Sequence, residues 1–122
     1  MKELTTYPHK YTDVVATDEP VVPGMAHHKY QIKTKGSPEG EVPHALGEIS
    51  FQNGPIKEAG VCGVMDENLL AILIDRLQGF QSGPYKSREN AIALTHLEEA
   101  MLWLNHRTAK REARGVEGTH TV

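Results

Sequence analysis

The pattern of apolar and polar positions changes character halfway along the chain. In the first half, residues 28–35 (HKYQIKTK) and 48–53 (EISFQN) alternate apolar with polar side chains, which is typical of half-buried β-strands. The GSPEG segment at 36–40 predicts the loop that joins these two strands, and the NGP sequence at 53–55 predicts a turn after the second. We therefore expect a small antiparallel β-unit in this half.

The second half carries the periodicity of two amphipathic helices. Asp66 is the expected N-cap of the first helix, which Gly83 and Pro84 end, and Ser87 is the expected N-cap of a longer helix that stops near Gly115. The apolar stripes of the two helices consist of Leu69, Leu73, Leu77 and Phe80, widened by Leu70 and Ile74, and of Leu94, Leu97, Met101 and Leu104. The short loop between the helices predicts an antiparallel helical hairpin.

The longer helix has a second apolar face. Ile92, Leu102 and Trp103 point away from its leucine stripe, so they stay exposed on an isolated hairpin. Two explanations remain open: the β-unit covers this face, or copies of the chain associate through it.

Together these elements predict an α+β fold in a single domain of residues 1–122, assembled as an oligomer. Residues 1–26 contain prolines and no helical period, so they are expected to form an irregular arm with short extended pieces. The β-unit then spans residues 27–64, the helical hairpin 65–115 and a tail 116–122.

Composition excludes several classes of function. A net charge of −3 gives no general attraction to duplex DNA or to an anionic membrane. No segment reaches the roughly 18 apolar residues of a membrane span, and the charged start lacks the apolar core of a signal peptide, so a cytoplasmic protein is expected. The single cysteine, Cys62, excludes an internal disulfide.

The sequence contains no recognisable catalytic or metal-binding motif. Its seven histidines lack ligand spacing, and no HExxH, GxSxG, P-loop or dinucleotide-binding sequence occurs. Glu98 and Glu99 are adjacent and diverge around their helix, which argues against a paired acid and base. We expect no enzyme activity, no cofactor and no metal.

One basic cluster is a candidate binding site. Arg107, Lys110, Arg111 and Arg114 lie near the end of the longer helix, and Arg107 and Arg111 share a face one turn apart. Two guanidinium groups can hold a phosphate or diphosphate, although basic residues also complement the carbonyl groups at a helix C-terminus.

Two further residues have both a ligand-binding and a structural interpretation. Asn90 lies in the apolar sector of the longer helix, where an amide needs a hydrogen-bonding partner, and also three residues after the Ser87 cap. Phe80 offers a platform for adenine, and it also belongs to a leucine stripe.

Three segments of the chain resemble a known family. ISFQNGPIKEAGVCGV, ENLLAILIDRLQGFQSGPYKSRENAIALTHLEEAMLWLNHRT and ARGVEGTH are similar to the Thoeris anti-defence 1 (Tad1) proteins of phages and prophages, whose hairpin is shared with anti-CBASS 2 (Acb2) proteins. The resemblance covers roughly residues 28–120. It implies a sponge that binds the cyclic ADP-ribose isomer of Thoeris immunity, and in some members CBASS cyclic di- or trinucleotides, without degrading them.

The resemblance also implies a site. It places Phe80 against adenine, Asn90 as a hydrogen-bonding group, and Arg107 with Arg111 on the phosphates. Asn90 and Arg107 are separated by about 25 Å along one helix, so we expect two antiparallel hairpins to close each pocket, in a dimer or a trimer of dimers. The host cell cytoplasm is the expected location.

A second, symmetric cyclic-nucleotide site is expected at Arg88 and Thr95, which lie only about 20° apart around the helix. Arg88 also has a simpler interpretation as a solvated first-turn residue. Two other classes of function stay open: a phosphodiesterase-like enzyme that degrades the signal, and a nucleic-acid-binding phage module.

Overall fold

The computed structural model describes residues 2–6, 9–20 and 25–122. The chain forms two compact units. The first is built from the residues up to Asn53 together with Cys62–Val64, and the second from Gly54–Val61 together with Met65–Val122. This division does not test the expectation of a single domain, which stays a prediction.

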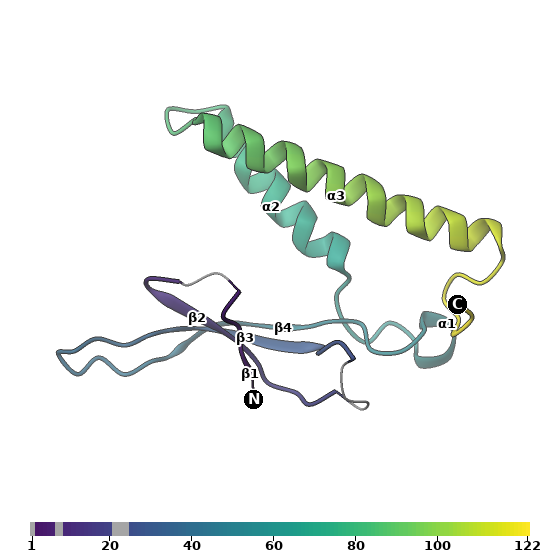
Figure 1. The fold of residues 1–122 in the computed structure, drawn as a ribbon, viewed down its shortest axis with the longest axis horizontal. Coiled ribbons are helices and arrows are strands. Elements are labelled where there is room, and N and C mark those ends of the chain that lie inside the picture. Colours follow the sequence, from purple (N-terminus) through teal and green to yellow (C-terminus); the bar gives the residue numbers. More distant parts are fainter. Residues whose placement is uncertain (1, 7–8, 21–24) are drawn as a thin grey trace. The chain divides into compact units, whose positions relative to one another are not determined.

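The first unit is a four-stranded antiparallel sheet with the strands in sequence order (Figure 1). The strands are β1 (Lys2–Glu3), β2 (Thr12–Ala16), β3 (Lys29–Thr34) and β4 (Ala45–Ser50). With the helices of the second unit, this sheet confirms the α+β class.

The alternating segments form β3 and β4, with one boundary different from the expected one. β4 begins at Ala45 rather than at residue 48, because the Thr34 N–H donates to the carbonyl of His44 and so pairs the strands from that point. The register shifts between Ile32 and Lys33, which interrupts the alternation opposite this first part of β4. Phe51 continues beyond β4 as a parallel bridge to Val64.

Within residues 1–26, where an irregular arm with short extended pieces was expected, β2 is a regular strand of the sheet. This strand pairs with β3 along its whole length, and Val15 and Ala16, 6% and 0% exposed, are the buried hydrophobic residues of the described chain. Pairing with a partner more than a dozen residues away overrides the weak local pattern. Residues 1, 7, 8 and 21–24 of the arm lie outside the described residues.

Asp18 joins β2 to β3. Its carboxylate accepts hydrogen bonds from the main-chain N–H groups of His28 at 2.9 Å and of Lys29 at 3.1 Å. The bond from His28 is the main reason why the pKa of Asp18 lies below its ordinary value, and the bond from Lys29 adds to it. Desolvation acts in the opposite direction. The two hydrogen bonds fix the start of β3 to the residues that follow β2.

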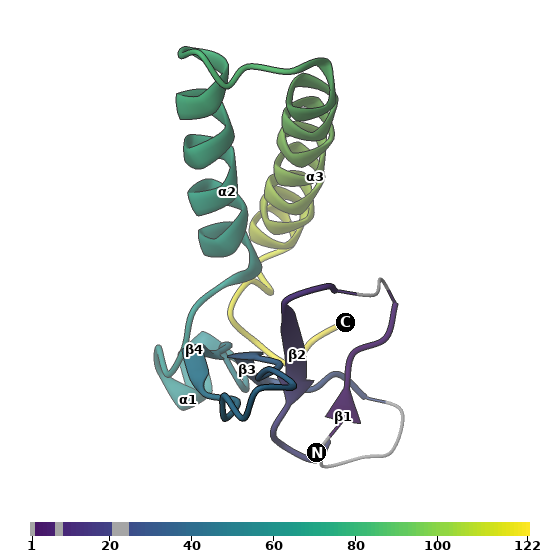
Figure 2. The same cartoon turned by 90° about the vertical axis from the view of Figure 1, so that its left-hand side faces the viewer.

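The second unit contains the helical hairpin. A short helix α1 (Ile56–Ala59) comes first, followed by α2 (Asp66–Gln81) and α3 (Arg88–Ala113). Helices α2 and α3 run antiparallel and side by side (Figure 2). The four-residue helix α1 was not expected, because the NGP sequence before it predicts only a turn.

The helix starts are defined by local hydrogen bonds. Ser87 caps α3 as expected, since its Oγ accepts from the Asn90 N–H at 3.0 Å. Asp66 is not the cap of α2: it is the first helical residue, and Met65 holds the cap position. The Met65 N–H donates to Oδ1 of Asn68 at 2.8 Å, while Asp66 places its charge in the first turn, where the helix dipole favours it.

The hairpin encloses no fully buried side chain, since neither α2 nor α3 contains one. The expected stripes are half-buried along the seam, except that Leu73 is 46% exposed at its edge. Within the described residues, no helix is long and apolar enough to cross a membrane.

Candidate functional site

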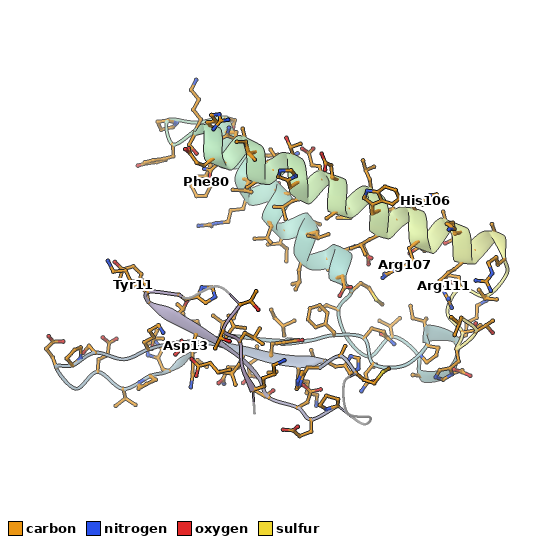
Figure 3. All side chains as sticks on the ribbon, viewed as in Figure 1. Tyr11, Asp13, Phe80, His106, Arg107 and Arg111 are labelled. Atoms are coloured by element: carbon orange, nitrogen blue, oxygen red, sulfur yellow. The ribbon has the colours of Figure 1, made fainter. Side chains whose placement is uncertain are left out.

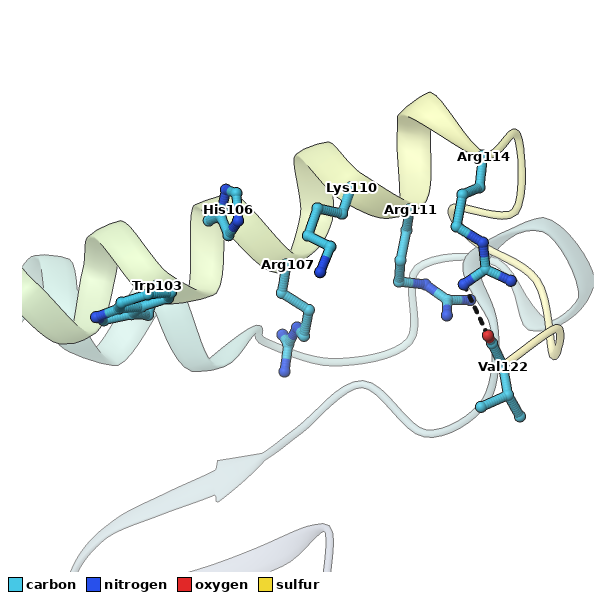
Figure 4. A pocket seen from close by; sticks show the side chains of 7 residues that line it. All are labelled: Trp103, His106, Arg107, Lys110, Arg111, Arg114 and Val122. Atoms are coloured by element: carbon cyan, nitrogen blue, oxygen red, sulfur yellow. Dashed lines mark hydrogen bonds between the residues drawn. The ribbon is translucent and has the colours of Figure 1, made fainter.

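A cationic pocket lies at the C-terminal end of α3 (Figure 4). It has a volume of about 440 Å³ and is lined by Trp103, His106, Arg107, Lys110, Arg111, Arg114 and Val122. The expected basic cluster therefore shares one pocket, and the four cationic side chains extend from the same side of the helix.

Arg107 is the more accessible of the two central arginines. Its Nη2 lies 3.5 Å from Oε1 of Glu67 in the first turn of α2, and the side chains are 57% and 26% exposed. A contact of this length between exposed groups is weak, at roughly 0–1 kcal/mol. Arg107 is therefore available to an anion at little cost.

Arg111 is half-buried and bound to the tail. Its Nη2 donates to the main-chain oxygens of Val116 and Thr119, each at 3.1 Å. Arg114 makes a similar contact, from Nη1 to the main-chain oxygen of Val122 at 2.8 Å (Figure 4). The residues after α3 thus fold back against its basic end.

The tail is also attached to α1. The Lys57 N–H donates to the carbonyl of Gly118 at 2.9 Å, and Glu58 forms an ion pair with His120. Gly118 has a φ of 76°, and a Cβ there would lie 3.0 Å from Cγ of Lys57, so glycine suits both the turn and the close approach.

The charge of the pocket is strongly positive. Among the described residues, Glu67 has the one side-chain carboxylate that forms an ion pair with any of its four cations. The pocket can therefore attract a multiply charged anion, although the whole chain carries a net charge of −3. The same cations also complement the C-terminus of α3, so the two interpretations are compatible.

Phe80 and Asn90 lie at the opposite end of the hairpin. Figure 3 shows Phe80 near the loop that joins the helices and Arg107 and Arg111 towards the far end of α3. The Gln81 side chain binds both the N–H and the carbonyl of Ser87, at 2.9 and 3.0 Å, which fixes this loop end. One chain therefore has Phe80 and Asn90 at the end of the hairpin that lies away from the arginines.

The Asn90 side chain is available for a ligand. The Ser87 N–H, which a reciprocal capping box would assign to Asn90, donates instead to Gln81 Oε1. Asn90 uses only its main-chain N–H in the cap, and its half-buried amide group bonds to none of the described residues. The capping explanation therefore covers the Asn90 main chain and not its amide.

Phe80 has a neighbour that sequence reasoning missed. The guanidinium carbon of Arg76 lies 5.0 Å from the centre of the half-buried Phe80 ring, a cation–π contact. The spacing of four residues on one helix is a signal that the sequence contains. The contacts of Arg107 with Glu67 and of Arg111 with the tail have no such signal in the sequence, because they depend on how distant segments pair.

Arg88 and Thr95 are both exposed on α3. The Thr95 hydroxyl donates to the carbonyl of Ala91 at 3.1 Å, and its oxygen remains able to accept. Both residues are therefore accessible on the surface of the single chain.

The apolar face of α3 is exposed in the chain. Ile92, Leu102 and Trp103 are 40%, 68% and 72% exposed. A shallow pocket of about 370 Å³ on this face is lined by Glu99, Leu102, Trp103 and His106. Trp103 belongs to both pockets, so the apolar face borders the cationic one.

Within the part of the chain that the structure describes, no three side chains of histidine, cysteine, aspartate or glutamate gather as a metal site would require. Among the described residues, three histidines each contact one carboxylate of their own unit: His27 with Asp18, His96 with Glu99, and His120 with Glu58.

Comparison with known proteins identifies the hairpin. The model of the "Acb2/Tad1, hairpin domain" family matches residues 44–109. A Bacillus phage SBSphiJ7 protein named Thoeris anti-defense 1 is 46% identical over 113 residues, which cover 93% of this chain and 79% of that protein. With a family match over its hairpin and a relative this similar along nearly its whole length, the chain belongs to the Acb2/Tad1 family.

Proposed function

We propose that this protein is a phage anti-defence sponge, which binds a cyclic ADP-ribose-type signal of Thoeris immunity in the host cell and withholds it without degrading it. The name of the similar Bacillus phage protein supports the anti-defence role. An anionic, phosphate-containing ligand is inferred from the cationic pocket, in which Arg107 is exposed and only weakly paired.

The binding site is composed from two chains. Phe80 and Asn90 supply a stacking surface and an amide for the base, and Arg107 and Arg111 supply donors for the phosphates. Because about 25 Å of helix separates Asn90 from Arg107, a second, antiparallel hairpin brings the complementary end to each pocket. A twofold dimer then holds two equivalent sites.

The exposed surface of the hairpin supports this self-association. Neither long helix has a buried residue, while Ile72, Leu102 and Trp103 are 63%, 68% and 72% exposed. An apolar surface of this kind is stabilised by burial in an assembly. The assembly is a homodimer or a trimer of dimers.

Sequestration requires affinity and abundance only. A sponge in excess over the signal, with a dissociation constant below the activation threshold of the immune effector, keeps the free signal low by mass action. Arginine–phosphate bonds and base stacking each contribute about 1–3 kcal/mol to that affinity. No group in the pocket has to act as a nucleophile or base.

A second ligand class is proposed for the exposed pair Arg88 and Thr95. In a trimer of dimers, the guanidinium and hydroxyl groups of several chains would converge on one axis and present donors to a CBASS cyclic di- or trinucleotide. Replacing Arg88 by alanine would then remove that binding and leave the cyclic ADP-ribose site unchanged.

The proposal is tested by recovery of the ligand. The cyclic ADP-ribose isomer is incubated with the protein, the mixture is heat-denatured, and the supernatant is assayed by mass spectrometry. Intact ligand that was unavailable before heating supports a sponge, whereas a hydrolysed product supports a signal-degrading enzyme. A parallel titration with nucleic acid distinguishes the third class, because binding there with a steep salt dependence contradicts the proposal.

A further inference from the structure

Arg111 makes both of its protein hydrogen bonds from one nitrogen. Its Nη2 donates to the carbonyls of Val116 and Thr119. An –NH₂ group carries two hydrogens, so both are in use. Among the described residues, Nε and Nη1 of Arg111 donate to no protein acceptor.

This arrangement determines how Arg111 can meet an anion. A guanidinium offers two forks for bidentate binding, one formed by Nε with Nη2 and the other by Nη1 with Nη2. Nη2 belongs to both. While the tail is bound, Arg111 therefore has no open fork and can offer a phosphate only single N–H groups.

Arg107 has the opposite properties. It is 57% exposed, and its one hydrogen-bonding or ionic contact among the described residues, with Glu67, is 3.5 Å long, at the limit for a hydrogen bond. It lines the same pocket as Arg111, one helical turn earlier. A phosphate entering this pocket can therefore engage a complete fork of Arg107 without breaking a strong protein contact.

The tail has attachments of its own that keep it against Arg111. Gly118 accepts from the Lys57 N–H, His120 pairs with Glu58, and the Thr119 hydroxyl donates to the Val116 carbonyl at 2.5 Å. A ligand that took either fork of Arg111 would displace one of its two charge-assisted bonds to the tail and loosen this turn.

We propose that the two arginines have different tasks: Arg107 makes the bidentate grip on a phosphate, whereas Arg111 chiefly folds the tail turn against the cationic pocket and adds only single N–H donors to the ligand. The inference rests on the proposed function and deepens it, because it gives the two arginines different tasks. It also gives the tail a task, since Val122 at its end lines the pocket beside Arg114.

Two probes, inorganic pyrophosphate and the cyclic ADP-ribose isomer, test whether Arg107 and Arg111 have these different tasks. Binding is followed by the fluorescence of Trp103, the one tryptophan of the chain, which lines the pocket. Arg107→Lys removes the fork and should weaken binding by about tenfold or more. Arg111→Lys should weaken binding less, by about threefold, since an ammonium group can still donate to both tail carbonyls but the single N–H donors to the phosphate are lost.

A double-mutant cycle tests the link to the tail. Gly118→Val strains a residue with a φ of 76° and crowds Lys57, whereas Gly40→Val strains a residue with a φ of 98° in the β3–β4 loop and serves as the matched control. Arg111→Ala and Gly118→Val should each weaken binding about tenfold, with no further loss in the double variant, and Gly40→Val should have no effect.

Hydrogen exchange gives a readout that needs no ligand. The Thr119 N–H, which donates to the Val116 carbonyl, should lose protection in Arg111→Ala while the amides of α3 keep theirs. Retained protection of Thr119 overturns the inference. Equal losses in Arg107→Lys and Arg111→Lys also overturn it, as do losses that multiply in the double variant.

The two proposals fail in different ways. If pyrophosphate shows the expected pattern and the cyclic ADP-ribose isomer does not bind, the proposed function is wrong and the division of tasks stands. If neither probe binds the wild-type chain, the phosphate grip of Arg107 is overturned as well.

Discussion

Ser87 and Asn90 are joined by a single hydrogen bond, from the Asn90 main-chain N–H to the Ser87 hydroxyl oxygen at 3.0 Å. The bond caps α3 without using the Asn90 side chain. Ser87→Ala should therefore lower the free energy of unfolding by about 1 kcal/mol and leave ligand affinity nearly unchanged. Asn90→Ala should show the reverse, with normal stability and weaker ligand binding. Urea denaturation and ligand titration of both variants measure this separation, and a binding loss in Ser87→Ala equal to that in Asn90→Ala would contradict it.

Glu67 is expected to limit the affinity of the cationic pocket. Its carboxylate is the one ionic partner of Arg107 among the described residues, and a bound phosphate would lie beside it. Glu67→Gln should tighten ligand binding several-fold by removing this repulsion, while stability changes by less than about 1 kcal/mol because the pair is exposed. Glu39→Gln, at an exposed residue of the β3–β4 loop, removes the same charge and is the control. Calorimetric titration measures the affinities, and unchanged or weaker binding in Glu67→Gln would count against the assignment of Arg107.

Leu102 is expected to lie in the contact between chains. It is 68% exposed and lines the shallow apolar pocket but not the cationic one. Leu102→Asp should yield monomers, because a charge would be buried in the assembly, and should also abolish ligand binding although no proposed ligand-binding residue is altered. Tyr85→Asp, at a residue 75% exposed in the hairpin loop, should change neither property. Native mass spectrometry and ligand titration test both variants, and a monomeric Leu102→Asp that still binds ligand would separate assembly from binding.

Asp18 should make the stability of the sheet dependent on acid pH. Its pKa is lowered from an ordinary value of 3.8 in the folded protein, chiefly by the main-chain N–H of His28. A depressed folded pKa contributes stability that is present above the unfolded value and is lost as the pH falls through the folded value. The chain should therefore lose stability below about pH 4, and Asp18→Asn should show a smaller loss there. Thermal unfolding measured across that range tests this, and identical pH profiles would refute it.

The hairpin could be predicted because its signals are local. Apolar periodicity, the Ser87 cap and the glycine and proline at 83 and 84 all lie within the segments that they define. β2 lacked such signals: its apolar run is short, and its stability comes from pairing with β3, so that Val14 lies opposite Ile32. Sequence reasoning was weakest where a segment is fixed by a distant partner.

In the candidate site too, features with local sequence signals could be predicted, and contacts between distant segments could not. The basic cluster could be recognised from residues one turn apart, and its gathering in one pocket follows from the helix. The contacts that distinguish Arg107 from Arg111 could not be foreseen, since Glu67 is 40 residues from Arg107 and reaches it only through the antiparallel register. The tail contacts likewise depend on a turn whose acceptors are main-chain carbonyls, which every residue type possesses.

The central claim, that each ligand is held between the loop end of one hairpin and the arginine end of another, is tested by complementation. One chain carries Phe80→Ala with Asn90→Ala, and the other carries Arg107→Ala with Arg111→Ala, so neither alone contains a complete pocket. After the two are mixed and allowed to exchange subunits, about half of the dimers should be mixed, and each mixed dimer should contain one intact pocket. Calorimetric titration should therefore show high-affinity binding of the cyclic ADP-ribose isomer at a fraction of the wild-type stoichiometry. A mixture that exchanges subunits and still binds no ligand would contradict the account.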